Sequence, residues 1–150
     1  MLALKINTTK AFMHKLLIED TFHKFSLAEA SITTFNQFHI DGKLYMDFFD
    51  TDTAQQLTEN GEIYSSWQDV KSYCYSIIRG KLPPLQFNIP AVSNGEISDL
   101  FLNIQYKNNE LLCTTGIFSR IFTLDKTFET AWDNAVLNFF RKHQIDFTIL

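Results

Sequence analysis

Four polar side chains lie inside apolar, strand-like patterns, where a ligand-binding side chain would enter a hydrophobic interior. They are Thr34, Asn36, Thr114 and Thr115. Hydroxyl and amide groups fix the orientation of a small molecule in pockets whose walls are mostly apolar and aromatic. The chain has 15 Phe among 150 residues, which favours a large aromatic core or a Phe-lined pocket. In the second case, these four side chains are the predicted ligand-binding residues.

Two cations, Arg79 at the end of a predicted helix and Lys81 just after it, are the predicted anion-binding residues. The stretch from Lys71 to Lys81 contains three basic residues and no acidic one. The alternative is a solvated rim of the fold, which is the ordinary place for a short basic stretch. Neither residues 78–81 nor residues 113–116 have the glycine spacing that wraps a phosphate in backbone amides, so no nucleotide cradle is predicted.

Residue types used in hydrolysis and metal binding are present, but not at working spacings. There is no G-x-S-x-G nucleophile elbow, no H-x-x-x-H or H-E-x-x-H pair, and no C-x-x-C. Asp47, Asp50 and Asp52 do not fit an EF-hand frame, because the required glycine and closing glutamate are missing. The sequence predicts no catalytic residue, no metal site and no cofactor, and it leaves open whether the protein is an enzyme. The histidines are scattered, at His14, His23, His39 and His143.

The charge balance argues against nucleic acid as a partner. The chain has 13 Lys and Arg against 17 Asp and Glu, a net charge of −4, so it repels phosphate on the whole. The acidic excess is concentrated in residues 41–62, which contain six acidic residues and one lysine. We expect no nucleic-acid partner.

The same composition predicts a cytoplasmic protein. No apolar run approaches the roughly 18 residues that a membrane helix needs, and residues 1–6 lack the regions of a secretory signal. Cys74 and Cys113 each lie in an apolar pattern. We predict two buried free thiols; a disulfide between them is the alternative.

Hydrophobic periodicity predicts the order β-α-β-β-α-β-β-β-α-β. Residues 73–78 belong to the second helix in this prediction, with a strand as the alternative, and residues 50–62 read as an acidic loop. The expected strands are residues 2–6, 25–40, 43–49, 85–89, 100–106, 111–122 and 145–149, and the expected helices are residues 9–18, 67–79 and 127–142.

Two hairpins organise this prediction. Asp41-Gly42 is typical of a type I′ turn and would pair Ile40 with Lys43, Phe38 with Tyr45 and Phe35 with Phe48. Asn108-Asn109 is the second predicted turn, because Asn tolerates the left-handed conformation. Gly116 is expected to form a bulge in the returning strand.

These elements predict a single α+β domain over residues 1–150. The expected architecture is an antiparallel or mixed sheet built from β-hairpins and covered by two or three helices. Exposed hairpin edges can recruit a partner strand or a second copy of the chain. The predicted function is therefore a non-enzymatic binding or protein-interaction domain; the alternative is a small-ligand-binding protein or enzyme that uses a Phe-lined pocket.

Several segments together resemble one family of proteins. The segments are residues 29–42, 78–87, 101–106, 112–116 and 122–126, with Trp132-Asp133. They are similar to a family of small cytosolic Firmicute proteins defined as a domain of unknown function. The resemblance covers nearly the whole chain, although residues 89–100 are shorter than expected. It implies one domain and brings no activity, cofactor or catalytic residue.

Overall fold

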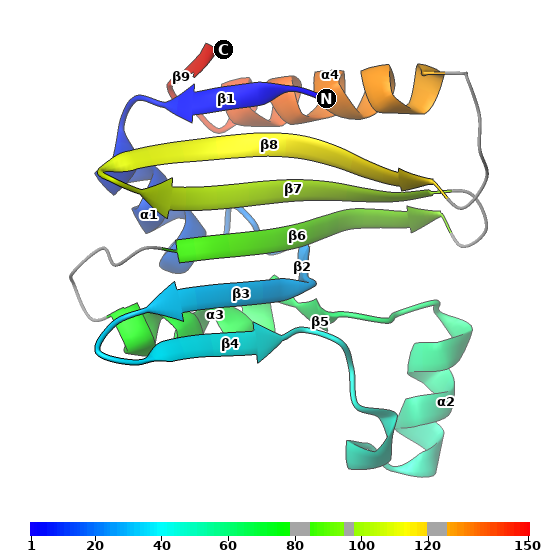
Figure 1. Cartoon of the computed structure of the whole chain (residues 1–150). Helices are drawn as coiled ribbons and strands as arrows, with labels where there is room; N and C mark the ends of the chain where they lie inside the picture. The colour runs from blue at the N-terminus through cyan, green and yellow to red at the C-terminus, as the bar shows by residue number, and fades with distance from the viewer. Residues whose placement is uncertain (79–84, 95–97, 120–125) are drawn as a thin grey trace.

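A seven-stranded antiparallel sheet with the order β4-β3-β6-β7-β8-β1-β9 forms the body of the protein (Figure 1). The computed structural model describes residues 1–78, 85–94, 98–119 and 126–150. The strands of this sheet are β1 (Ala3–Ile6), β3 (Glu29–Thr33), β4 (Gln37–Asp41), β6 (Leu85–Asn94), β7 (Ser98–Lys107), β8 (Glu110–Ser119) and β9 (Phe147–Ile149). The short strands β2 (Ser26–Leu27) and β5 (Ser65–Ser66) pair separately.

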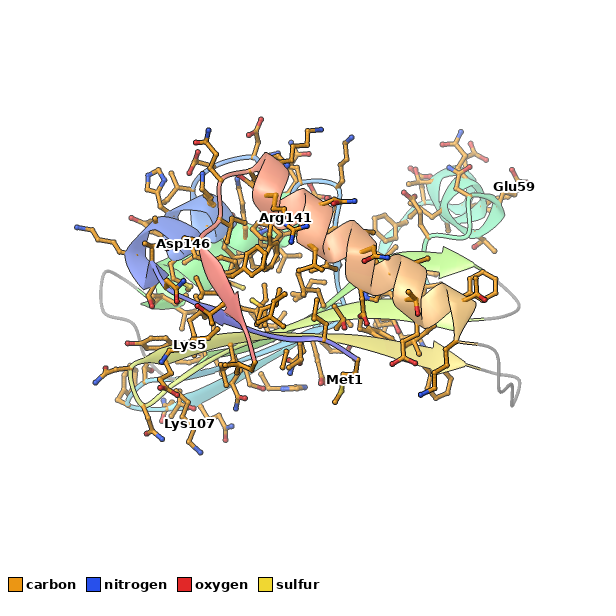
Figure 2. All side chains as sticks on the ribbon, turned by 90° about the horizontal axis from the view of Figure 1, so that it is seen from above. Met1, Lys5, Glu59, Lys107, Arg141 and Asp146 are labelled. Carbon is orange, nitrogen blue, oxygen red and sulfur yellow. The ribbon has the colours of Figure 1, made fainter. Side chains whose placement is uncertain are left out.

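Three helices cover one face of the sheet, and a fourth stands apart. They are α1 (Thr9–Leu17), α3 (Trp67–Ile78) and α4 (Thr127–Lys142). Figure 2 shows them on one side of the strands, with α2 (Thr51–Glu59) at the far end. A 3-10 turn, η1 (Met46–Phe48), precedes α2. The α+β prediction is confirmed, since all pairings of the described strands are antiparallel.

Strand alternation places the core between the sheet and these helices. Leu4 and Ile6 of β1 are buried, as is Cys113 of β8 in register with Leu4. Successive side chains of a strand point to opposite faces, so the buried residues of these strands together present an apolar surface to the helices. Trp67, at the start of α3, is fully buried, and its indole nitrogen donates a 2.7 Å hydrogen bond to the Leu16 carbonyl at the end of α1.

The helices over residues 9–18 and 127–142 are confirmed nearly to the residue. Residues 73–78 lie in α3, so the strand alternative for them is wrong. The Asn108-Asn109 turn is also confirmed, because both residues have positive φ (54° and 62°) and Lys107 pairs with Glu110.

The predicted bulge at Gly116 is wrong. Gly116 pairs with Phe101 in an unbroken register between β7 and β8. The irregularity lies in β6 instead, between Pro90 and Val92. Proline lacks the N–H that a ladder needs, so it is a natural position for a register shift.

The Asp41-Gly42 hairpin is wrong as well. Residues 25–40 form β2, β3 and β4 rather than one strand, and the chain reverses at residues 34–36, so that Ile32 pairs with Phe38. Gly42 does not adopt positive φ. It is the position where the chain passes Leu27: a Cβ atom there would lie 1.8 Å from the Leu27 carbonyl oxygen. The glycine therefore permits a close backbone approach, not a type I′ turn.

The predicted strand over residues 43–49 and the predicted loop over residues 50–62 are also wrong. These residues contain η1 and α2. The Asp50 carboxylate accepts a 2.7 Å hydrogen bond from the Thr53 N–H and so caps α2, and this bond lowers the pKa of Asp50. No residue of α2 is buried, which explains why hydrophobic periodicity did not reveal the helix.

Candidate functional site

The four predicted ligand-binding residues do not meet in one pocket. Thr34 and Asn36 lie together in the turn between β3 and β4, where the Thr34 N–H donates a 2.8 Å hydrogen bond to the Asn36 carbonyl. Thr114 and Thr115 are neighbours in β8 and therefore face opposite sides of the sheet. Arg79 and Lys81, the predicted anion-binding residues, lie outside the described residues.

Thr115 lies beside a cavity of about 210 Å³ between β8 and α4. The cavity is lined by Met1, Thr115, Gly116, Ile117, Glu129, Trp132 and Asp133. The Thr115 hydroxyl accepts a 2.8 Å hydrogen bond from the Leu2 N–H and donates a 2.5 Å hydrogen bond to Asp133. The Met1 ammonium contacts Glu129 and lies 3.5 Å from Asp133, and its contact with Glu129 lowers the pKa of that carboxyl. The polar groups bind one another, so the network joins the two residues before β1, and β8, to α4.

Replacing Thr115 by valine tests this network. We expect Thr115→Val to lower the free energy of unfolding by about 2 kcal/mol, because the Leu2 N–H and Asp133 both lose a buried partner. Thr114→Val is the matched control: its hydroxyl accepts one long hydrogen bond, 3.4 Å from Asn103, and we expect a change below about 0.5 kcal/mol. Urea denaturation of both variants measures the difference; equal losses would contradict the network.

The phenylalanine-rich interior is built by rings that pack against each other. Phe22 lies 5.6 Å from Phe12, 5.5 Å from Phe25 and 5.3 Å from Phe139, measured between ring centroids. Phe139 also lies 5.1 Å from Phe25 in an edge-to-face arrangement. Such contacts are the ordinary packing of an aromatic core.

Both cysteines are buried and free, as predicted, and the disulfide alternative is wrong. Burial raises the pKa of Cys74 to about 12 and raises that of Cys113 still further. The thiolate is the reactive form, so we expect Ellman's reagent at pH 8 to leave the native protein nearly unlabelled and to label two thiols per chain in denaturant. Fast labelling of the native protein would contradict the burial.

Within the described residues, no group of three or more His, Cys, Asp or Glu side chains is placed to hold a metal ion. The same part of the chain contains no helix of the length and hydropathy needed to cross a bilayer.

The longer free edge of the sheet is β4. It pairs with β3 on one side and ends the strand order on the other, whereas the opposite edge strand, β9, has three residues (Figure 1). Gln37, His39 and Asp41 are exposed, and Phe38 and Ile40 are half-buried beside the helix-covered face.

The hydrogen-bond alternation determines which backbone groups of β4 face outward. The Gly42 N–H donates to the Ala28 carbonyl, and the Thr34 N–H donates to the Asn36 carbonyl. Even-numbered residues therefore form the hydrogen-bonded pairs of the β3–β4 hairpin. Phe38 and Ile40 therefore direct their N–H and C=O groups toward β3. Gln37, His39 and Asp41 direct theirs away from it; within the described ranges no backbone hydrogen bond joins them to another segment on that side.

Exposed aromatic side chains lie beyond both ends of β4. Phe35, in the turn before the strand, is 90% exposed, and Tyr45 and Phe48, after the strand, are 77% and 83% exposed. These three aromatic side chains therefore lie at the two ends of an edge strand whose outer side is free, and a free strand edge is a site where another strand can pair.

The chain after β4 forms an excursion that we call the acidic arm, residues 44–63. Its base is closed by a bridge between Lys43 and Tyr64 and by a 2.8 Å hydrogen bond from the Leu44 N–H to the Ile63 carbonyl. The arm contains five acidic residues and no basic one. Figure 1 shows that it passes beyond the β4 edge and ends in α2, so it borders the free edge on one side.

Sequence reasoning pointed to hairpin edges in general but not to β4 in particular. The Asp41-Gly42 prediction paired β4 with residues 43–49 instead of β3, so it did not place β4 at the edge of the sheet. Thr34 and Asn36 are typical turn residues, so they could have located the turn before β4, but not the free edge of the sheet.

The fold and the free edge define an α+β protein with a helix-covered antiparallel sheet, in which the edge strand β4 pairs with β3 on one side and is free on the other. The chain belongs to DUF5721, a family of unknown function, whose family model matches residues 15–94 and 90–148. No curated protein and no solved structure matches the chain.

Proposed function

We propose that residues 1–150 form a single, non-enzymatic protein-interaction domain that binds an extended strand at the β4 edge. The observation that carries this proposal is the outward direction of the backbone groups of Gln37, His39 and Asp41. An added strand gains main-chain hydrogen bonds from such groups, and neighbouring side chains provide selectivity.

The composition of β4 is consistent with an edge that another strand can join. Proteins usually block a free edge with proline, with lysine or by making the strand very short. β4 has five residues, no proline and no lysine, and the half-buried Phe38 and Ile40 offer apolar surface to a neighbouring strand. The shorter β9 has the form of a protected edge.

A peptide selection tests strand addition and does not require the natural partner to be identified. Random ten-residue peptides displayed on phage would be selected on the wild-type protein, and the enriched sequences measured by fluorescence anisotropy. We expect peptides with alternating apolar residues that bind the wild type. His39→Pro should weaken that binding at least tenfold, because proline removes an outward N–H and gives up no hydrogen bond to β3.

His39→Ala is the matched control, since it removes the same imidazole and keeps the N–H. We expect it to bind the selected peptides within about threefold of the wild type. Peptides that bind the proline and alanine variants equally, or the absence of any enriched peptide, would contradict strand addition.

The alternative function, a small-ligand-binding protein or enzyme with a Phe-lined pocket, has weaker support. The central rings Phe12, Phe22 and Phe139 are occupied by contacts with one another. The two free thiols are consistent with the cytoplasmic location that we propose, because reducing compartments keep cysteines unpaired.

A further inference from the structure

We propose that the strand received by β4 is β4 of a second copy of this chain, paired antiparallel about a two-fold axis at His39. This inference rests on the proposed function and names its partner. A two-fold interface uses the same surface on both copies, so that surface must be complementary to itself. β4 and its surroundings meet this condition in register, in charge and in the position of the exposed aromatic residues.

The register follows from the direction of the backbone groups. An axis at His39 places His39 opposite itself, Gln37 opposite Asp41 and Phe38 opposite Ile40. The residues with outward N–H and C=O groups, Gln37, His39 and Asp41, then form the hydrogen-bonded pairs of the new ladder. This is the register in which all five residues of β4 lie against β4 of the second copy.

Side-chain faces and charges also match in this register. Phe38 and Ile40 lie on the helix-covered face, so pairing them across the axis continues the apolar layer from one copy into the other. Asp41, the one carboxylate of the strand, faces the neutral amide of Gln37. A shift that placed Asp41 opposite itself would set like charges directly across the ladder, which destabilises strand pairs.

The exposed aromatic residues favour a second copy over an unrelated strand. In an antiparallel pair, the beginning of one strand lies beside the end of the other. Phe35, before β4, would therefore lie near the segment after β4 of the second copy, which carries Tyr45 and Phe48. Figure 1 shows that this segment runs to the open side of the edge, where the second copy would lie. The two-fold arrangement thus gives the exposed rings at both ends of the strand an apolar neighbour.

Disulfide trapping tests the register. A cysteine on the axis lies opposite its own copy, at about 5.5 Å between Cα atoms, which a disulfide can span. We expect His39→Cys to give a covalent dimer under mild oxidation. Gln37→Cys is the matched control on the same edge and face: it should form no covalent dimer alone and should cross-link when mixed with Asp41→Cys. Cys74 and Cys113 are buried, so they can remain in place.

Sedimentation velocity tests the association itself. We expect the wild type to show a concentration-dependent monomer–dimer equilibrium and His39→Lys to weaken it at least tenfold, because two ammonium groups would face each other. Thr33→Lys is the matched control, because Thr33 is exposed on the same face of the sheet but lies in the neighbouring strand β3. It should change the dimer dissociation constant less than threefold. Circular dichroism of both variants should match the wild type.

The outcomes separate this inference from the proposed function. Gln37→Cys dimers as abundant as His39→Cys dimers would overturn the register. A wild-type protein that stays monomeric at millimolar concentration would overturn the second copy as partner, and strand addition would still stand if selected peptides bind β4. Failure of both self-association and peptide binding would overturn both proposals.

Discussion

Gly42→Ala should destabilise the protein by about 3 kcal/mol or more, the largest effect we expect from adding a single methyl group. The added Cβ would lie 1.8 Å from the Leu27 carbonyl oxygen, 2.6 Å from its carbonyl carbon and 3.1 Å from the Ala28 oxygen. All three are backbone atoms, so the clash is relieved only if the chain separates where β4 ends and the acidic arm begins. Urea denaturation followed by tryptophan fluorescence measures the loss, because Trp67 is fully buried.

Gly116→Ala is the control for this prediction. The nearest atom to its added Cβ would be the Phe101 Cβ at 3.9 Å, which is an ordinary contact. We expect Gly116→Ala to leave the free energy of unfolding unchanged or to raise it by up to about 1 kcal/mol, since alanine restricts the unfolded chain. A Gly42→Ala protein as stable as Gly116→Ala would show that the chain does not pass close to Leu27.

Phe22→Ala should lower the free energy of unfolding by about 4 kcal/mol. Phe22 is fully buried and packs against Phe12, Phe25 and Phe139, so truncation leaves a cavity among rings that cannot all move to fill it. Thermal and urea denaturation measure the effect.

Phe35→Ala is the matched control, because the same side chain is 90% exposed in the turn before β4. We expect a change within about 0.5 kcal/mol at concentrations where the protein is monomeric. A loss below about 1 kcal/mol for Phe22→Ala would mean that the aromatic interior is loose enough to enclose a ligand, which would favour the pocket alternative.

Sequence periodicity was sufficient to predict the elements that bury one face. The apolar stripe through Trp132, Val136 and Phe140 predicted α4, and all three side chains are buried. The Asn108-Asn109 turn was predictable because its conformation depends on those two residues. The fold class follows from these local signals.

Local signals were insufficient where tertiary contacts decide the backbone. Asp41-Gly42 has the composition of a hairpin turn, yet the glycine is required by Leu27, a residue of another strand. The helix α2 has no buried face, so its apolar residues show too little periodicity to predict a helix. Its acidic residues favoured a loop instead. The first of these errors gave β4 the wrong partner strand, and the free edge was therefore not located.

The sequence therefore predicted what kind of site to expect, a free hairpin edge, but not where it lies. Hairpin edges were expected to attract a partner, but which edge is free depends on the pairing of β3 with both β4 and β6, which no local pattern of residues 29–41 encodes. Thr34, Asn36, Thr114 and Thr115 share a polar-in-apolar pattern, and the sheet places them at the β3–β4 turn and on two faces of β8.

Residue-resolved amide hydrogen exchange of β4, measured by NMR in dilute and in concentrated protein, tests the free edge most directly. Phe38 and Ile40 should be protected at both concentrations, because their N–H groups bond to β3. Gln37, His39 and Asp41 should exchange rapidly in the dilute sample and slow at least tenfold as the dimer forms. Exchange of these three amides that is slow already in the dilute monomer would contradict an open β4 edge. Exchange that stays rapid in the concentrated sample would contradict a second copy of the chain as the strand that this edge receives.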